Sequence, residues 1–590
     1  MIEMTGEDDI KGGIASFSIG LGNKGHSAVP IKPAPPFRVL IAGDFGLAAT
    51  GVAFNITGQD VEEILEQKTP SFSVSAVNML GSHPPELEEQ VSFARLKDLH
   101  PTKLLRGFRF VRDLEAASGD QDQLAVHDQR YDKIGKSALD EQKSLLERLL
   151  KDDELPASEQ GKRKENDASS SSKGTEGLDA LLSMIRTPEE KAAPGESGSA
   201  AKTAVDAFIQ KTLQETGQVS SAPVEGKKKD ALADTLQLEQ ARLFFESPKL
   251  SKVLLNWHGL NLLLSEVPFD LPLELHLLQL DHDLDAVDLQ EVLGETGEAL
   301  QAELYDIALF ANEIGLGPRD TERLKVLARE CAESDTVGLA ALAGHFAGVP
   351  GEEVADIETP HQLLDKPGFE GFAGLRASDA ASHLALFWND ARLTAEEDGA
   401  PALFVSGAFV ALSEILVQLE TDVFPRLPVG MPKDYDALEL VESRSMGGEV
   451  AMATRFAVGS DTAPSLALAG INVLEGVANR TSLVFRRAVT VQPGEDGRGA
   501  LDQALLVSRL FSLFQEALGE AVFAGQDADE REAAVATSLE VLSRSLSDKV
   551  AFEVERMAVE DQDLIGVTAF VQDGWASGQQ HSFYLPASGG

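Results

Sequence analysis

The stretch Phe37-Arg-Val-Leu-Ile-Ala-Gly-Asp-Phe-Gly46 decides the fold of the first part of the chain. Its first six residues are mostly apolar and do not alternate with polar ones, which is typical of a strand that is buried on both faces of a sheet. Gly43 to Gly46 predict the turn that ends this strand. Asp44 has two interpretations: a carboxylate at the carboxyl end of an α/β sheet, or a turn residue that accepts hydrogen bonds from nearby backbone amides. We favour the turn.

The sequence around this strand predicts a compact α+β unit of about 150 residues. Before the strand, Ile14 to Ile19 alternate like a lone strand. After it we expect helices at 59–67, 101–114 and 138–150, and strands at 71–77 and 89–93.

A short apolar helix follows, set between polar segments. Its apolar residues recur at i, i+3, i+4 and i+7, along one face of a helix that spans 176–186. These residues are Leu178, Leu181, Leu182 and Ile185. A polar linker precedes the helix at 154–175, and further linkers with one more predicted helix follow at 187–230. Because so short a helix is marginal alone in water, its apolar face must dock on this protein or on a partner.

The remainder of the chain, 231–590, predicts a larger mixed α/β domain. It opens with a helical pattern at 231–264, and alternating strand and helix segments follow from 273 onward. The clearest of the later helices are expected at 320–332, 402–419 and 501–518, and three closing strands at 549–554, 564–571 and 581–585. We therefore expect a mixed α/β fold, with an α+β domain at 1–153 before an α/β domain at 231–590.

Composition excludes some partners. Among the 590 residues, 96 are acidic and 51 basic, a formal charge of −45, whereas nucleic acids and anionic membranes need a basic surface. The two short basic runs, 162–164 and 227–229, lie in polar linkers and are interpreted as solvated loops. No apolar run could span a membrane. The N-terminal residues lack a signal-peptide pattern and Cys331 is the only cysteine, so we expect a cytoplasmic protein.

No motif for catalysis or metal binding is present. The sequence contains no P-loop, no His-Glu-x-x-His, no Cys-x-x-Cys and no Gly-x-Ser-x-Gly. His276 and His282 match no common ligand spacing, Trp257 is in phase with core leucines, and Cys331 has no recognisable partner. We expect no catalytic, cofactor-binding or metal-binding residues, no cofactor, and a role that is not enzymatic.

Residues 12–153 resemble the small subunit (TssB, VipA-like) of the contractile sheath of type VI secretion systems. The resemblance rests on the strand at 14–19, on the stretch 37–46 quoted above, on Asn55-Ile-Thr-Gly-Gln-Asp-Val-Glu-Glu-Ile-Leu65, and on Val91-Ser-Phe-Ala-Arg-Leu-Lys-Asp-Leu-His-Pro101. The last segment is similar to a strand, a Leu-Asp-Asp-Phe-Ser-Pro-like turn and a helix, with Leu99 and His100 where the family has Phe and Ser.

Residues 174–590 resemble the large subunit (TssC, VipB-like) of the same sheath, so the chain resembles a fusion of the two. The most specific segment is Phe244-Phe-Glu-Ser-Pro-Lys-Leu-Ser-Lys-Val-Leu-Leu-Asn-Trp-His-Gly-Leu260. It is similar to His-His-Pro-x-Phe-x-x-Leu-x-x-x-Trp-Arg-Gly-Leu, with His258 in place of Arg. Leu501 to Phe511 and Val550 to Leu585 are similar to a later helix and to the closing strands. The segment 376–403 departs from the family pattern after Asp379.

The resemblance implies a structural subunit that polymerises with itself into a helical sheath around an Hcp-like inner tube, stands on a baseplate, and ejects the tube by contraction. It implies that terminal strands insert into the sheets of neighbouring subunits; their residues here are Ile14, Phe17, Ile19, Phe583 and Leu585. It also implies that the helix at 176–186 binds a ClpV-like AAA+ ATPase; the alternative is that this helix packs on its own domain.

Two other functions remain open. One is a non-contractile adaptor or cap that has a sheath-like fold and binds a baseplate or a sheath end. The other is an enzyme with an unrecognised site.

Overall fold

The structure of the protein is a computed structural model that describes most of the chain. The described residues are 34–48, 51–117, 128–134, 236–294, 300, 304–396, 401–445, 448–492, 500–519, 527–559 and 562–587. The predicted strand at 14–19, the predicted helices at 138–150 and 176–186 and the linkers between 154 and 230 lie outside them, as do the predicted boundaries at 153 and 231.

The chain divides into two compact units. The second unit comprises residues 79–83 and 119–237. Within its described part, the backbone N–H of Ser82 donates to Asp132 Oδ1 at 2.8 Å, and that of Lys133 donates to the carbonyl of Leu80 at 3.0 Å. All elements described below belong to the first unit.

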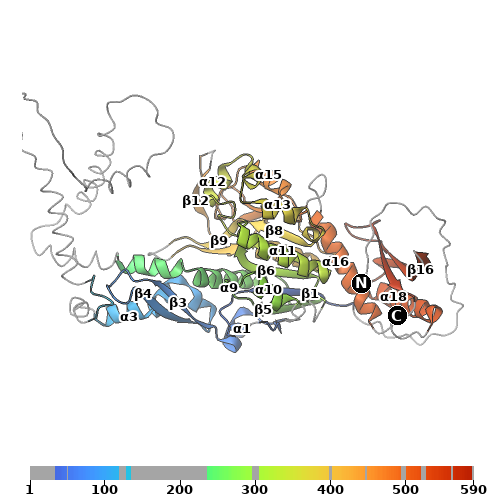
Figure 1. Cartoon of the computed structure of the whole chain (residues 1–590), viewed down its shortest axis with the longest axis horizontal. Helices are drawn as coiled ribbons and strands as arrows, with labels where there is room; N and C mark the ends of the chain where they lie inside the picture. The colour runs from blue at the N-terminus through green and yellow to red at the C-terminus, as the bar shows by residue number, and fades with distance from the viewer. Residues whose placement is uncertain are drawn as a thin grey trace, which may run out of the picture. The chain divides into compact units, whose positions relative to one another are not determined.

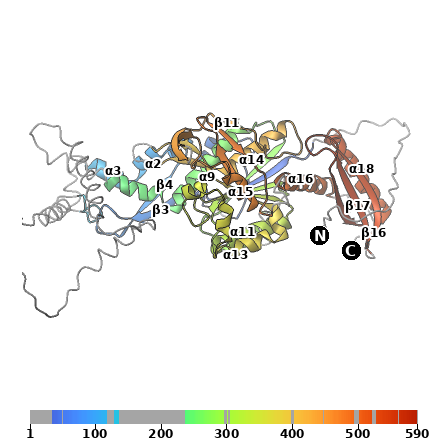
Figure 2. The ribbon, with the colours of Figure 1, turned by 90° about the horizontal axis from the view of Figure 1, so that it is seen from above.

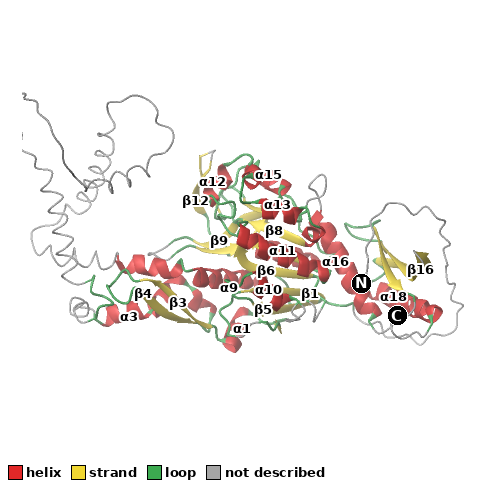
Figure 3. Ribbon diagram, in the orientation of Figure 1, coloured by secondary structure: helices red, strands yellow, loops and turns green. Residues whose placement is uncertain are grey.

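A large mixed sheet forms the centre of the first unit (Figures 1 and 3). It has nine strands in the order β11-β15-β14-β8-β7-β6-β1-β5-β2. The six strands from β14 to β5 run parallel, and β15, β11 and β2 pair antiparallel at the two edges. The bounds are β1 Phe37–Gly43, β2 Phe54–Asn55, β5 Leu273–Gln279, β6 Ile307–Ile314, β7 Val337–Leu342, β8 Leu384–Trp388, β11 Lys433–Asp434, β14 Ile471–Gly476 and β15 Ser482–Phe485. The expected mixed α/β fold is confirmed.

The first part of the chain contributes an interior strand, β1, to this sheet. β1 lies between β5 and β6, with Phe37 opposite Leu273 and Val39 opposite Ile307. The strand at 37–43 was predicted within a separate α+β unit; instead, both of its neighbours come from the second part of the chain. The physical reason is its composition, since an apolar run without alternation must be covered on both faces and paired on both sides.

Helices cover both faces of the sheet. Leu40 and Ala42 of β1 face a core cluster that includes Leu324 and Leu466, from helices on one side. Helices α10 (Ala286–Leu293), α11 (Pro318–Glu333), α12 (Gly351–Asp356), α13 (Glu370–Arg376) and α15 (Thr462–Leu468) contribute to that cluster. α9 (Pro248–Glu266) and α14 (Gly407–Val417) contact the sheet but contribute no residue to the cluster, and they cover the other face.

A two-stranded hairpin extends from this body. β3 (Ser71–Val77) and β4 (Glu86–Ser92) pair antiparallel and bury alternate side chains, as the predicted period of two requires. Phe93 follows β4 and packs edge-on against Trp257 of α9, with ring centroids 6.2 Å apart. Phe108 and Phe110 pack against Phe244, which precedes α9. Associated short helices are α1 (Val61–Lys68), η1 (Leu96–Leu99), α2 (Pro101–Gly107) and α3 (Arg109–Ala116).

Three predicted helices differ from the structure. The helical pattern at 231–264 is broken near Ser247, because Pro248 has no N–H and starts a new helix, α9. The segment 101–114 forms two helices that meet at Phe108, whose backbone is extended. The segment 402–419 opens as strand β10 (Leu403–Ser406), which pairs with β9 (Asp390–Thr394), and only then becomes α14.

The C-terminal part forms a smaller sheet. Its strands β16 (Val550–Val559), β17 (Gln562–Val571) and β18 (Gln580–Pro586) confirm the three predicted closing strands. Helices α16 (Ala500–Leu518) and α18 (Ala528–Ser545) share a hydrophobic core with this sheet. Figure 2 shows α16 leading from the main sheet toward α18. The remaining elements are η2 (Pro360–Asp365), η3 (Asp379–His383), η4 (Gln418–Glu420), β12 (Val441–Ser445) and β13 (Gly448–Met452). No helix in the described part is both long and apolar enough to cross a bilayer.

Candidate assembly module and its connection to the body

The C-terminal sheet and its two helices form a module with its own core. Phe583 and Leu585 of β18 point into this core, where they are 0 % and 6 % exposed. Phe583 stacks on Phe514 of α16, with ring centroids 5.0 Å apart. On α18, Val535 and Leu539 are buried in the same cluster. The structure therefore places both predicted C-terminal strand residues in the core of the module, while Ile14, Phe17 and Ile19 lie outside the described residues.

Among the described residues, no further strand pairs with the outer edge of β16 or of β18. In antiparallel pairs, opposite residues that exchange backbone hydrogen bonds alternate with pairs that do not. Since the N–H of Ala587 donates to the carbonyl of Asp563, the register turns the N–H groups of Ser582 and Tyr584 away from β17. The same alternation turns those of Phe552 and Val554 outward on β16. In the described part of the chain, none of these four N–H groups has a backbone partner.

A buried ion pair connects the module to the main sheet. Asp306 precedes β6 and is 2 % exposed; Arg509 of α16 donates to its Oδ2 at 3.2 Å. Asp306 also accepts hydrogen bonds from the backbone N–H of Arg38, at 2.8 Å, and from the hydroxyl of Ser512. Burial raises the pKa of Asp306, and the nearby Arg509 guanidinium opposes that shift. One carboxylate thus links β1, β6 and α16.

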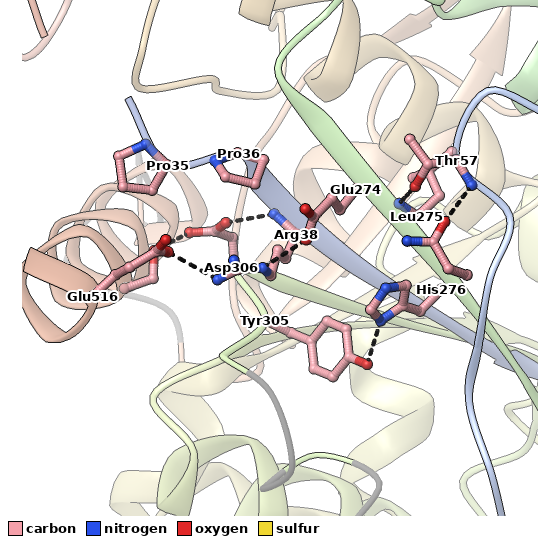
Figure 4. A network of polar contacts seen from close by, with 12 residues as sticks. Pro35, Pro36, Arg38, Thr57, Glu274, Leu275, His276, Tyr305, Asp306 and Glu516 are labelled. Atoms are coloured by element: carbon pink, nitrogen blue, oxygen red, sulfur yellow. Dashed lines mark hydrogen bonds and ion pairs between the residues drawn. The ribbon is translucent and has the colours of Figure 1, made fainter. Parts of the chain in front are cut away.

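Arg509 also forms hydrogen bonds with the two prolines that precede β1. Arg509 Nη1 and Nη2 donate to the carbonyls of Pro36 and Pro35 at 3.0 and 2.7 Å. Figure 4 shows both prolines beside Asp306, with Arg38 reaching Glu274 of β5 and Glu516 of α16. The residue before the prolines, Ala34, packs against the core of the C-terminal module. Residues 34–36, directly before β1, therefore lie at this module.

A second polar cluster lies at the carboxyl ends of the strands. Asp44 follows β1, is fully buried, and accepts a hydrogen bond from the N–H of Gly46 at 3.0 Å. His282 Nδ1 and Gln279 Nε2 also lie 2.9 and 3.0 Å from its two oxygens. Burial alone would raise the pKa of Asp44, but the hydrogen bonds from His282, Gln279 and Gly46 hold it below its ordinary value. Both interpretations of Asp44 thus describe its position: it ends a sheet strand and it organises the turn.

The other residues considered as candidates for catalysis or metal binding are buried within the fold. Trp257 is fully buried and its Nε1 donates to the carbonyl of Phe45 at 2.9 Å, so its predicted core role is confirmed. His258 is buried, which lowers its pKa to about 4 and leaves the ring neutral at pH 7. His276 Nδ1 lies 2.7 Å from the hydroxyl of Tyr305. Cys331 is fully buried, and burial raises the pKa of its thiol.

Sequence reasoning missed the Asp306–Arg509 pair. The two residues are 203 positions apart, and neither stands in a local motif. The only signals available were the charges themselves: Arg509 interrupts the apolar pattern of the helix at 501–518, and Asp306 stands directly before the apolar run that starts at Ile307.

Comparisons with solved structures find chains of low similarity to this one. The chain is similar to a chain in the cryo-EM structure of the anti-feeding prophage baseplate, with 12 % identity over 57 % of this chain and 77 % of that chain, at a TM-score of 0.29. It is also similar to a sheath tail protein from Desulfitobacterium hafniense, with 9 % identity over 48 % of this chain and 57 % of that chain, at a TM-score of 0.28. No family model and no curated protein matches the sequence.

Proposed function

We propose that this chain is a structural subunit of a contractile injection sheath. In this proposal, copies polymerise helically around an inner tube, and the role is structural rather than catalytic. The observation that carries it is the C-terminal module, a small sheet that is joined to a large body by α16 and whose two edges pair with no strand in the described part of the chain. Soluble monomers normally protect such edges, because they offer unpaired backbone groups to other chains.

Strand addition would use these edges to link neighbouring copies. A strand that pairs with an open edge gains main-chain hydrogen bonds that do not depend on a particular side-chain match. Ala34, which lies just before β1, packs against the core of the module. The sixteen residues from Ile19 to Ala34 can extend about 50 Å, so the predicted strand at 14–19 could reach a module of another copy.

The finer assignment rests on the sequence. The ordered motifs of the small and large type VI sheath subunits in one chain favour a fused sheath protein of a secretion-type system. We therefore propose three partners, which are an Hcp-like tube, a baseplate and a ClpV-like ATPase, and we propose the cytoplasm as the compartment. The interleaving of β1 with β5 and β6 supports the fusion, because both parts contribute to one sheet.

The test is electron microscopy of the full chain, purified alone and with its inner-tube protein. We expect long hollow tubes. Ser582→Pro removes an outward N–H from β18 while leaving the bonds to β17 in place, so it should abolish or shorten the tubes. Ser582→Ala is the matched control: it also loses the hydroxyl contact with Thr568, at 3.1 Å, but keeps the N–H.

Folding of each variant is checked through Trp575, whose Nε1 donates to the carbonyl of Phe424 beside the module. Normal tubes from a folded Ser582→Pro variant would show that the β18 edge does not link copies. Discrete particles from the wild-type chain under all conditions, including with the tube protein present, would overturn the sheath function and leave an adaptor or cap in its place.

A further inference from the structure

The C-terminal module is also contacted by a segment that starts and ends in the body. Residues 421–427, here called the strap, lie between η4 and β11. Upstream of the strap, α14 is buried in the body along almost its whole length. Downstream, the N–H of Gly430 donates to the carbonyl of Phe485 in β15 at 2.8 Å, and β11 pairs with β15. The body therefore holds the chain on both sides of the strap.

The middle of the strap is inserted into the module. Phe424 is 1 % exposed and belongs to the hydrophobic core that α16, α18 and the three closing strands share. Its carbonyl accepts a hydrogen bond from Trp575 Nε1 at 2.7 Å. Trp575 packs against the same core, and Arg426 Cζ of the strap lies 5.7 Å from the centroid of its ring. The strap thus supplies a core residue to a module that is otherwise built from the C-terminal part of the chain.

Hydrogen bonds also fix the two ends of the strap. Lys549 Nζ, just before β16, donates to the carbonyl of Thr421 at 3.3 Å. The N–H of Leu427 donates to Asp502 Oδ1 in the first turn of α16 at 3.2 Å. Both partners belong to the module, so the strap is joined to it at each end as well as at its centre.

We propose that the strap is a clamp that fixes the orientation of the module relative to the body. Two parts of a chain that are joined by a helix move relative to each other unless a further apolar interface prevents it. A segment with both ends in the body and a buried aromatic residue in the module removes that freedom. In the proposed sheath, a pull on the module then reaches the main sheet through the strap as well as through α16. Only this consequence rests on the proposed function, because the clamp is tested within a single chain.

The experiment measures the distance between body and module in the full chain by pulsed electron paramagnetic resonance. Spin labels are attached to Val287→Cys on α10 and Val541→Cys on α18, which replace exposed side chains, whereas the native Cys331 is fully buried and should not react. Labelled chains are diluted with unlabelled ones, so that only distances within one chain contribute. We expect a narrow distance distribution for the intact strap. Phe424→Ser removes the buried anchor and should broaden the distribution at least about twofold.

A milder variant and two controls isolate the strap. Trp575→Phe keeps an aromatic ring but loses the hydrogen bond to Phe424, so it should broaden the distribution less. Leu539→Ser removes a side chain of the same core from α18 instead of from the strap. Trp388→Phe removes an indole N–H that has no hydrogen-bond partner in the described structure. Both controls should keep the wild-type width, and urea unfolding checks that each variant folds.

A broad distribution for the intact strap, or a wild-type width for folded Phe424→Ser, would overturn the proposal. So would equal broadening by Leu539→Ser, because loss of core packing would then loosen the module without any role for the strap. If Phe424→Ser does not fold, Trp575→Phe decides the matter, and an unchanged width refutes the clamp. The measurement requires no tubes, so failure of the sheath function and failure of the clamp are distinguishable.

Discussion

Replacing Glu414 by Gln should stabilise the protein at neutral pH. Glu414 lies on α14 and is 2 % exposed. Tyr435 Oη donates to its Oε1 at 3.1 Å, while Oε2 has no hydrogen-bond partner in the described structure. Burial raises the pKa of this carboxyl to about 7; Tyr435 and Lys433 oppose the shift and Glu266 adds to it. If Glu414 ionises, the hydrogen bond from Tyr435 and the charge of Lys433 therefore offset little of the cost of burying its negative charge.

The sign and size follow from linkage. The pKa is raised from 4.5 to about 7 on folding, so between these pH values the unfolded chain ionises while the folded one stays protonated. Stability is therefore lost as pH rises from about 4.5 to about 7 and stays low above. A shift of about 2.5 units corresponds to about 3 kcal/mol at pH 8. Gln keeps a side-chain oxygen that can accept the hydrogen bond from Tyr435, and it never ionises. Glu414→Gln should therefore recover most of the stability that is lost at pH 8.

The assay is urea unfolding at pH 4.5 and pH 8, followed by tryptophan fluorescence. Glu414→Gln should shift the midpoint upward at pH 8 and much less at pH 4.5, where Glu414 is already protonated in the folded protein. Glu420→Gln is the matched control, an exposed carboxyl just beyond the same helix. Equal gains at both pH values would mean that the change improves packing or helix propensity, and the reasoning from ionisation would be wrong.

Two further predictions concern the module and the apolar helix. Arg509→Met leaves Asp306 buried without its cation and should destabilise the protein by about 3–5 kcal/mol in the same urea assay; adding Asp306→Asn should recover part of the loss, and no recovery would mean that the pair does not act through charge. Leu181→Asp with Leu182→Asp should abolish binding of a ClpV-like ATPase without changing the melting temperature or the tubes; a large drop in melting temperature would instead assign this helix to the core of the protein.

Local patterns predicted the elements whose burial follows from their own sequence. The strand at 37–43, the hairpin strands near 71–77 and 89–93 and the closing strands near 550–585 all appear where the period and the apolar runs placed them. Helix 501–518 also appears nearly as predicted. In these segments the side chains that pack together are close in sequence or share a face, so the pattern contains the information.

Pairing between distant segments could not be predicted in this way. Nothing in the residues 37–43 tells which strands lie beside them, because any parallel neighbour of suitable length satisfies an apolar strand. The same holds for Asp306 and Arg509, which are ordinary charged residues until the fold brings them together. Residues 403–406 show a different ambiguity: four apolar or small residues before a helix fit either a strand or the first helical turn.

The position of β1 also limits how a sheath built from this chain could move. β1 is hydrogen-bonded on both sides, to β5 and β6, and Leu40 and Ile41 at its centre are fully buried. Separating the first part of the chain from the second would break this central pairing, and that costs far more than local opening does. Contraction would then have to move the body as one piece. In such a sheath, the movement would have to be taken up at contacts between copies, because the Asp306–Arg509 pair also holds α16 on the body.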